Sequence, residues 1–307
     1  MKEFERLFSI SGLSLDRMRA FLMVVGAGGV SAAAKGDPVR QSQYSRQLKE
    51  LEGYFGIPLT RLVGRRIQIT PQGYRLAEII RRHFSELDDF RESSAGRPVC
   101  VRIGAQGSVL DWLLLPTLSG IRETLGGALI EFEQLRSAEI VAEVSDGRLD
   151  FGVVRADAVH AGMKKWRLGE LRYSVFAPVA VWRSHVSPEE VLGTLEMGGL
   201  LPGGEFQGKL EEWYSEHGIT PRIVARMPSF LQVARLTRIS GLPSVLPEIA
   251  SAEFDPRRIS GRRPRWKLGR ELVLIVNRRA IDRSGIPDRA VAGLKALLSG
   301  TLSAFEH

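Results

Sequence analysis

Residues 28–73 constrain the fold of this chain more than any other stretch of its sequence. They begin with a run of small residues around Ala33, pass through a turn at Gly36-Asp37-Pro38, and enter an amphipathic run over residues 40–54. A two-stranded ribbon with a basic tip at Gly64-Arg65-Arg66 is predicted to follow. Helix, turn, helix and basic ribbon is the order of a winged helix-turn-helix, which predicts a DNA-binding unit.

The amphipathic run has two chemically different faces. Its apolar residues recur at helical spacing and predict a buried stripe of Tyr44, Leu48, Leu51 and Phe55. The opposite face carries amide, hydroxyl and cationic groups, which read base edges and hold phosphates. We expect DNA contacts from Arg40, Gln41, Ser42, Gln43, Ser45, Arg46 and Lys49, joined by Arg65 and Arg66 of the ribbon tip. The alternative is an ordinary solvated helix face, which the flanking helix and ribbon disfavour.

The spacing of these residues resembles the DNA-binding domain of LysR-type transcriptional regulators. The shared positions are Ala33-Ala34, Gln41, Ser45-Arg46-Gln47-Leu48, Leu51-Glu52, Phe55-Gly56, Leu59 and Ile69-Thr70-Pro71-Gln72-Gly73. The sequence departs from the family pattern at Asp37-Pro38, Arg40, Gln43, Thr60 and Leu62, which affects the expected target and the wing contacts more than the fold. The resemblance implies an all-α winged helix-turn-helix over residues 1–73 and sequence-specific binding of double-stranded DNA.

A long helix is predicted over residues 71–92. Its apolar residues Leu76, Ile80, Phe84 and Leu87 step by four, four and three positions, a seam typical of paired helices. The polar, Gly/Pro-containing stretch 91–98 predicts a hinge. We expect residues 74–97 to form a linker and dimerisation helix with this hinge, as the resemblance also implies, and a homodimer or homotetramer to result. The alternative is that the seam packs on the chain's own domains.

From Val99 onward, short apolar strands alternate with helical runs, which predicts an α/β domain with a parallel sheet and right-handed crossovers. A late strand after a self-contained unit indicates that the chain crosses twice between two lobes, leaving a cleft. We expect an effector-binding domain over residues 98–307. One lobe would comprise residues 98–178 and 271–307, and the other residues 179–270.

This half also resembles the effector domain of the same family, which has a periplasmic-binding-protein-like fold. The matching phrases are Val101-Arg102-Ile103-Gly104-Ala105, Leu114-Leu115-Pro116, residues 146–154 and residues 239–247. The resemblance implies a small-molecule effector in the cleft, and a helix start after a strand suits an anion such as a carboxylate. The expected lining is Gln106, Gly107, Ser108, Arg155, Gly203, Gly204, Ser229 and Phe230. For each residue, the alternative is an ordinary loop or cap contact.

Composition agrees with an anionic partner, because the net charge is +8 and the isoelectric point is near 9.9. Residues 30–82 carry ten Lys or Arg residues against four acidic ones. The single cysteine, Cys100, excludes an internal disulfide and a cysteine zinc cluster. The basic segment 255–267 remains open between a loop, a phosphate-binding patch and a subunit contact.

The sequence contains no Ser-His-Asp arrangement, metal-spaced His/Cys set, Walker loop or GxGxxG motif. We therefore expect neither catalysis nor a metal or cofactor. No apolar run approaches the ~20 residues of a membrane span, and the N-terminus carries acidic residues, so a cytoplasmic protein is expected. The alternatives are a solute-binding protein and a winged-helix regulator of another family with a solute-binding-like sensor.

Overall fold

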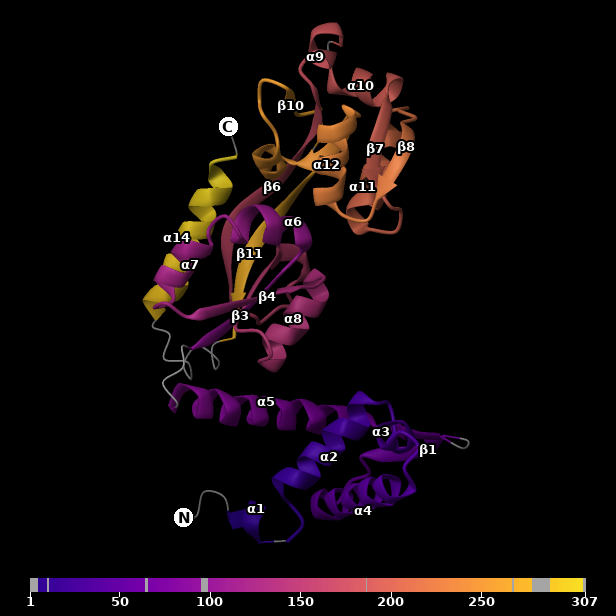
Figure 1. The fold of residues 1–307 in the computed structure, drawn as a ribbon, viewed down its shortest axis with the longest axis vertical. Helices are drawn as coiled ribbons and strands as arrows, with labels where there is room; N and C mark the ends of the chain where they lie inside the picture. Colours follow the sequence, from indigo (N-terminus) through magenta and orange to yellow (C-terminus); the bar gives the residue numbers. More distant parts are fainter. Residues whose placement is uncertain are drawn as a thin grey trace. The chain divides into compact units, whose positions relative to one another are not determined.

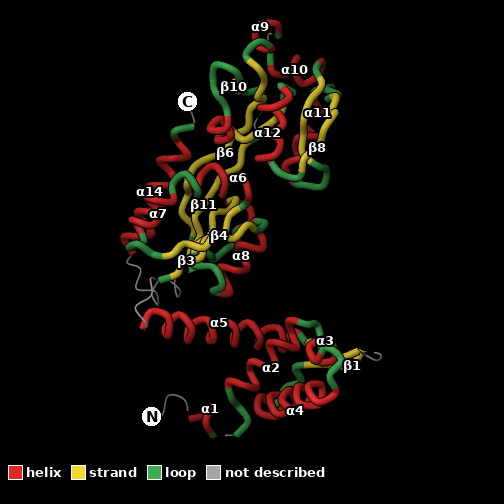
Figure 2. The backbone as a smooth tube through the Cα atoms, viewed as in Figure 1, coloured by secondary structure: helices red, strands yellow, loops and turns green. Residues whose placement is uncertain are grey.

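The computed structural model describes residues 5–9, 11–63, 66–94, 99–185, 187–266, 268–277 and 288–305. The chain divides into two compact units, Met1–Ala95 and Gly96–His307 (Figure 1). The first is helical apart from one two-stranded ribbon, whereas the second mixes strands and helices throughout (Figure 2). Each unit has its own apolar core.

The N-terminal unit contains the expected helix-turn-helix and ribbon. Its elements are α1 (Glu5–Phe8), α2 (Leu15–Gly26), α3 (Val30–Ala34), α4 (Pro38–Phe55), β1 (Thr60–Val63), β2 (Arg66–Ile69) and α5 (Pro71–Ser94). Asp37 caps α4, since its Oδ1 accepts hydrogen bonds from the backbone N–H groups of Val39 and Arg40 at 2.9 and 3.3 Å. Pro38 then occupies the first turn, where a missing N–H has no cost. The Asp37-Pro38 departure from the family pattern is therefore a helix start.

One apolar core holds the N-terminal unit together. Phe21, Leu51 and Leu59 are fully buried, and α5 adds Ala77 and Ile80 to the same cluster. The predicted stripe of α4 is confirmed: Leu48 is buried with Leu51, and Tyr44 and Phe55 pack against the cluster. The helix that carries the predicted DNA contacts is thus fixed by burial of its opposite face.

The predicted dimerisation seam on α5 requires a correction. Ile80 is only 2% exposed and belongs to the unit's own core, against which Leu76 and Phe84 also pack. Leu87 alone among the four is exposed, at 54%. The physical reason is that α5 lies along α2, so the first part of its apolar face is needed to complete the three-helix core. The alternative interpretation, own-core packing, is correct for Ile80, whereas Leu76 and Phe84 are only partly buried by the core.

The C-terminal unit has two lobes. The elements of lobe I are β3 (Cys100–Ala105), α6 (Gly107–Val109), η1 (Leu110–Leu114), α7 (Leu118–Thr124), β4 (Leu129–Gln134), α8 (Ser137–Asp146), β5 (Phe151–Arg155), η2 (Ala156–Ala158) and α14 (Asp288–Ser303). Those of lobe II are α9 (Val181–Ser184), α10 (Pro188–Thr194), β7 (Glu196–Leu200), α11 (Glu205–Glu216), β8 (Arg222–Met227), α12 (Phe230–Ser240), β9 (Ser244–Pro247), η3 (Glu248–Glu253) and β10 (Ile259–Arg262). Strands β6 (Lys165–Pro178) and β11 (Gly269–Val276) connect the lobes (Figure 1).

The strand order is β4-β3-β5-β11-β6-β9-β7-β8, with β10 beside β6. The β3–β4, β3–β5, β7–β8 and β7–β9 pairs are parallel, as expected from strand–helix alternation. The two crossing strands are antiparallel to each other, because β6 leads into lobe II and β11 returns from it. The sheet is therefore mixed, and the purely parallel expectation holds only within the lobes.

The helical run that follows β3 is interrupted. The structure has the short α6, a π-helical turn η1 and, after residues 115–117, the separate helix α7. Pro116 lies in the break, and proline lacks the N–H that a continuous helix would need there.

The turn at residues 146–150 has a structural role. Gly147 ends α8 in the left-handed region, at φ 78°. The Asp150 carboxylate accepts a hydrogen bond from the Arg102 backbone N–H at 2.8 Å, which ties β5 to β3. Arg148 forms ion pairs with Glu143 and Asp146. This phrase therefore stabilises lobe I and lies outside the expected effector site.

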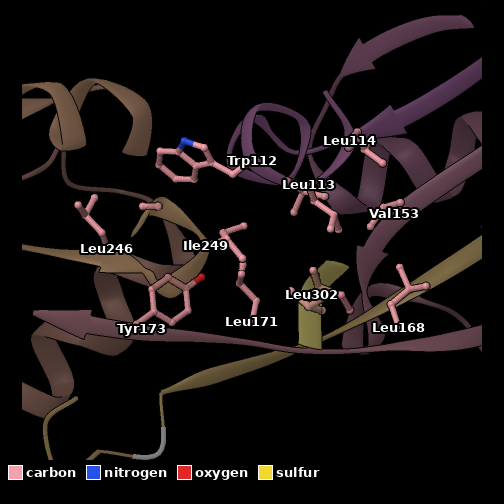
Figure 3. Packing of buried hydrophobic residues seen from close by; sticks show 14 of the residues in the cluster. Trp112, Leu113, Leu114, Val153, Leu168, Leu171, Tyr173, Leu246, Ile249 and Leu302 are labelled. Carbon is pink, nitrogen blue, oxygen red and sulfur yellow. The ribbon is translucent and has the colours of Figure 1, made fainter. Parts of the chain in front are cut away.

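The apolar core of the C-terminal unit is continuous from one lobe into the other. Figure 3 shows Trp112 and Leu113 from lobe I, Ile249 from lobe II and Leu171 of the connecting strand within one buried cluster. The Trp112 indole donates to Glu253 Oε1 at 3.1 Å. Among the described residues, none of the helices has the length and apolar character needed to cross a membrane.

Candidate nucleic-acid interface and effector site

The outward face of α4 presents the predicted DNA-contacting groups. Ser45 is half-buried, and the other predicted residues of this helix are exposed: Arg40, Gln41, Ser42, Gln43, Arg46 and Lys49. An open groove runs beside this face, lined by the start of α2 at Ser14 and Arg17 and by Ser42, Gln43 and Arg46 of α4. The helix therefore offers hydroxyl, amide and cationic groups along one accessible side.

Two arginines flank a single carboxylate on this face. Glu50 accepts hydrogen bonds from Nε of Arg46 at 3.0 Å and from Nε of Arg17 at 2.5 Å. These bonds, from Arg46 first and then from Arg17, lower the pKa of Glu50, so the carboxylate is ionised. Arg46 keeps most of its side chain in solvent. Arg17 was missed from sequence because it belongs to α2, and only the fold brings it beside α4.

The first turn of α4 has its own contacts. Arg40 forms an ion pair with Asp37 at 3.5 Å, and Gln41 Nε2 donates to Ser31 Oγ of α3 at 3.4 Å. Val39 is 76% exposed at the same end of the helix. An exposed aliphatic side chain beside polar readers is the group that contacts a thymine methyl. Sequence reasoning missed Val39 because it sought polar residues.

The wing is docked on α4 through Glu52. Its Oε1 accepts from the backbone N–H groups of Leu59 and Thr60, both at 2.9 Å, and from the Thr60 hydroxyl at 3.0 Å. Thr60, a departure from the family pattern, thus supplies a third bond to Glu52. Gly64 and Arg65 lie outside the described residues, and so does the side chain of Arg66, so the expected contacts of the wing tip lie outside them too.

The closing phrase of the N-terminal unit is explained by packing. Thr70 Oγ1 donates to the Pro58 carbonyl at 2.9 Å and accepts from the Gly73 N–H at 3.0 Å, which starts α5. A Cβ atom at position 73 would lie 2.4 Å from the Leu59 carbonyl oxygen. Glycine is therefore required where α5 crosses the base of the wing.

The expected effector residues of lobe I lie at the start of α6. The Gln106 carbonyl accepts the first helical bond from Leu110, at 2.8 Å. A Cβ atom at Gly107 would lie 3.2 Å from Gln134 Nε2, so Gln134 at the end of β4 joins this turn. Ser108 follows on α6, which packs near α12 of lobe II. The turn therefore does face the other lobe.

The expected residues of lobe II occupy the starts of two helices. Ser229 Oγ caps α12, because it accepts a hydrogen bond from the Gln232 backbone N–H at 3.3 Å. The observed contact of Ser229 is therefore a helix cap, which was the alternative to a ligand contact. Phe230 is the first residue of α12. Gly203, with φ +94°, and Gly204 form the turn into α11. These two turns place Phe230 and the beginning of α11 on the side of lobe II that meets the crossing strands.

A charged cluster connects the two lobes. Arg155, at the end of β5, forms ion pairs with Glu205 and, at 3.6 Å, with Asp157. Arg270 of β11 lies 3.9 Å from the same Glu205. Burial by itself would raise the pKa of Glu205, but Arg155, Arg270 and Lys209 together lower it, so this carboxylate is ionised. Sequence reasoning found Arg155 and missed Arg270 and Glu205, which no local pattern marks.

Three aromatic rings border this cluster. Tyr173 of β6 stacks on Phe206 of α11 with centroids 4.2 Å apart, and Phe230 lies 5.2 Å from Phe206. The Arg270 guanidinium lies 5.8 Å from the Phe206 ring. Burial raises the pKa of Tyr173 to about 12, although the two arginines oppose that shift. Figure 3 shows the Tyr173 hydroxyl directed toward the region between the lobes. The site thus combines two cations with an aromatic wall.

Cys100 begins β3 and is half-buried. Burial, followed by a hydrogen bond with Glu131, raises the pKa of its thiol to about 11. Thiolates are the reactive form of cysteine, and the raised pKa keeps this thiol largely protonated near neutral pH.

Comparison with known proteins identifies both units. Residues 15–74 match the bacterial regulatory helix-turn-helix protein profile of the lysR family, and residues 100–285 match the LysR substrate binding domain. A probable hydrogen peroxide-inducible genes activator of Mycobacterium leprae is 29% identical over 150 residues, which are 48% of each chain. The match thus spans about half the length of that relative.

Solved structures share the fold over nearly the whole chain. Full-length CbnR complexed with its target DNA superposes with a TM-score of 0.59 at 19% identity, covering 92% of this chain and 100% of that one. Full-length LysG from Corynebacterium glutamicum with bound effector Arg gives a TM-score of 0.61 at 17% identity, covering 95% and 99%. With both domain profiles matched in order, the chain belongs to the family of LysR-type transcriptional regulators.

Proposed function

We propose that this protein is a sequence-specific DNA-binding transcriptional regulator whose DNA affinity or geometry changes when a small molecule binds its C-terminal unit. The observation that carries the proposal is the face of α4. Its polar and cationic side chains are exposed, while its apolar stripe is buried in the core of a LysR-type helix-turn-helix. The CbnR relative, solved with its target DNA, supports the same use of this unit.

Within the DNA interface, we assign two kinds of role. Gln41, Ser42 and Ser45 face base edges, with Arg40, Gln43 and the exposed Val39 beside them. Arg46, Lys49 and the wing arginines Arg65 and Arg66 hold phosphates. The ion pair between Arg46 and Glu50 orients the Arg46 guanidinium before DNA binds, and the Glu50 carboxylate partly offsets its positive charge. Arg17, held by the same Glu50, is an additional phosphate contact from α2.

Assembly is assigned to the part of α5 that the core leaves uncovered. Ile79 and Leu87 are exposed, and His83 lies between them at helical spacing. This stripe is rotated from the buried face that contains Ile80. We infer that it pairs two chains and sets the distance between their two copies of α4, since helix-turn-helix proteins usually bind paired half-sites. A homodimer is the smallest assembly this arrangement requires, and a homotetramer is compatible with it.

We assign the effector to the region where the two lobes meet. The supporting observations are the turn at Gln106, Gly107 and Ser108, which faces α12, and the cluster around Arg155, which joins both lobes. Gly203, Gly204, Ser229 and Phe230 form the facing side. LysG, a relative in fold, was solved with an effector bound. A ligand that prefers one arrangement of the lobes can shift the regulator between states.

Response to peroxide through a thiol is disfavoured, although one relative is named for hydrogen peroxide. The sequence has one cysteine, so no disulfide can form within the chain. That thiol is half-buried and has a raised pKa, which opposes oxidation. The proposed signal is therefore a bound molecule.

The proposal is tested by selecting genomic DNA fragments with the purified protein and measuring affinity for the recovered site at several salt concentrations. Arg46→Ala should weaken binding to all sequences and reduce the slope of log affinity against log salt by about one. Val39→Ala should instead reduce discrimination at one base pair by ~1 kcal/mol and leave the salt slope unchanged. If neither variant differs from the parent, α4 does not dock in the proposed way.

A further inference from the structure

We propose that the effector is a small carboxylate, and that Glu205 occupies the position of its anionic group until it binds. This inference rests on the proposed effector function of the cleft and names the chemistry of the ligand. The geometry that points to it is the meeting of Arg155 from lobe I, Arg270 from the crossing strand and Glu205 from lobe II. Glu205 thus acts as a removable internal ligand.

The two arginines are largely buried and poorly satisfied. Their side chains are 15% and 11% exposed. Among the described residues, Nε of Arg155 and Nη2 of Arg270 have no hydrogen bond, and the contact of Arg155 Nη1 is its ion pair with Glu205. A buried guanidinium without well-directed acceptors is costly to fold, so such groups persist mainly where a ligand completes them. Asp157 contributes little, because it is exposed and 3.6 Å away.

The Glu205 carboxylate, which faces these arginines, is placed where a ligand can displace it. The Glu205 side chain is 44% exposed, far more than either arginine, so solvent reaches it. Lys209, one helical turn later, lies 3.4 Å from Glu205 and remains available as a partner after displacement. Glu205 also follows directly on the Gly203-Gly204 turn, where the backbone can adjust. Both guanidinium groups, in contrast, are held by strands of the sheet.

The surroundings of the cluster define the rest of the ligand. Phe206, Phe230 and Tyr173 form an apolar wall beside the arginines. Planar guanidinium groups bind carboxylates in a fork geometry, and the aromatic wall favours an apolar remainder over a second charge. The ligand class is therefore a monocarboxylate with an apolar or aromatic body.

Displacement of Glu205 would also transmit the signal. In the structure, Glu205 ties α11 of lobe II to β5 of lobe I through Arg155. A ligand carboxylate on the two arginines breaks this tie and replaces it with a different connection. The two states then differ in how the lobes are linked, which is the differential interaction that regulation requires.

The test is direct binding of phenylacetate and hexanoate, each compared with its neutral amide, by titration calorimetry on the full-length protein at low chloride. Glu205→Gln removes the competing charge and keeps the side chain's size, so carboxylate affinity should rise at least about tenfold, or about 1.4 kcal/mol. Amide binding should not change. Glu212→Gln, an exposed residue on the same helix, is the matched control and should bind like the parent. Arg270→Gln should abolish carboxylate binding.

A thermal shift measurement guards against misfolded variants. Glu205→Gln leaves the arginines without their carboxylate, so its melting temperature should fall and be restored by phenylacetate more than the parent's is. The inference is overturned if Glu205→Gln binds carboxylates no better than Glu212→Gln, or if amides and sulfate bind as well as phenylacetate. Operator affinity separates the two proposals. Carboxylate binding without any change in DNA affinity would contradict the regulatory role alone. Regulation by a neutral or cationic compound would contradict only the assignment of the effector as a carboxylate.

Discussion

Substitutions at Ile80 and Leu87 separate folding from assembly on the same helix. Ile80 is 2% exposed inside the core of the N-terminal unit, and Leu87 is 54% exposed near the end of α5. Ile80→Ala should therefore lower the unfolding free energy of this unit by ~2–5 kcal/mol, the usual cost of truncating a buried isoleucine. The dimer should persist wherever the unit remains folded.

For Leu87 the expected effect is on association. Full burial of leucine is worth about 2 kcal/mol, so covering its exposed half contributes about 1 kcal/mol per chain and about 2 kcal/mol per symmetric dimer. Leu87→Asp also places a poorly solvated charge in each copy of the seam, which adds ~1–3 kcal/mol. These contributions sum to about 3–5 kcal/mol, so the dissociation constant should rise by about two to four orders of magnitude. Stability of the N-terminal unit should change by less than about 0.5 kcal/mol.

Sedimentation velocity over a concentration series measures the dissociation constant, and urea unfolding followed by circular dichroism measures stability. Operator affinity should fall with Leu87→Asp, because the paired half-sites are no longer bridged. The assignment of Leu87 to the surface that pairs two chains is refuted if Leu87→Asp sediments as the parent does. It is also refuted if Ile80→Ala dissociates the dimer without destabilising the N-terminal unit.

Two further predictions concern packing and thiol chemistry. Gly73→Ala should destabilise the N-terminal unit by ~1–3 kcal/mol, because the added Cβ would meet the Leu59 carbonyl oxygen. Gly53→Ala on α4 adds a Cβ that meets no other atom, so it should stabilise the unit by ~0.5–1 kcal/mol. Equal urea unfolding midpoints for the two variants would contradict this contrast. Cys100, with its pKa raised to about 11, is protonated below that pH, so alkylation by iodoacetamide at pH 8 should be far slower than for a free thiol and should accelerate toward pH 11. Rapid alkylation at pH 8, or loss of DNA binding with equimolar peroxide, would show that the thiol is accessible and reactive.

Local patterns predicted the elements of the DNA-binding unit well. Helical spacing identified the buried Leu48 and Leu51 of α4, and hence the opposite face that carries Gln41 and Arg46. These are predictable because the contacts involved lie within one helix or in the turn beside it. Arg17 and Val39 were not found, the first because its neighbour Glu50 is 33 residues away, the second because it is apolar.

The sequence by itself determined the family, through the resemblance of its motif residues. It also determined most of the elements and the strand–helix alternation that builds two lobes, since these depend on periodicity and turn chemistry over short distances. Only the tertiary structure decided that Ile80 belongs to the core and not to a dimer seam, because an apolar stripe does not reveal which surface will cover it. Only the structure joined Arg155 to Arg270 and Glu205, which come from three elements spread over more than a hundred residues. Such a cluster forms when two crossing strands bring the lobes together, and no local pattern encodes that meeting.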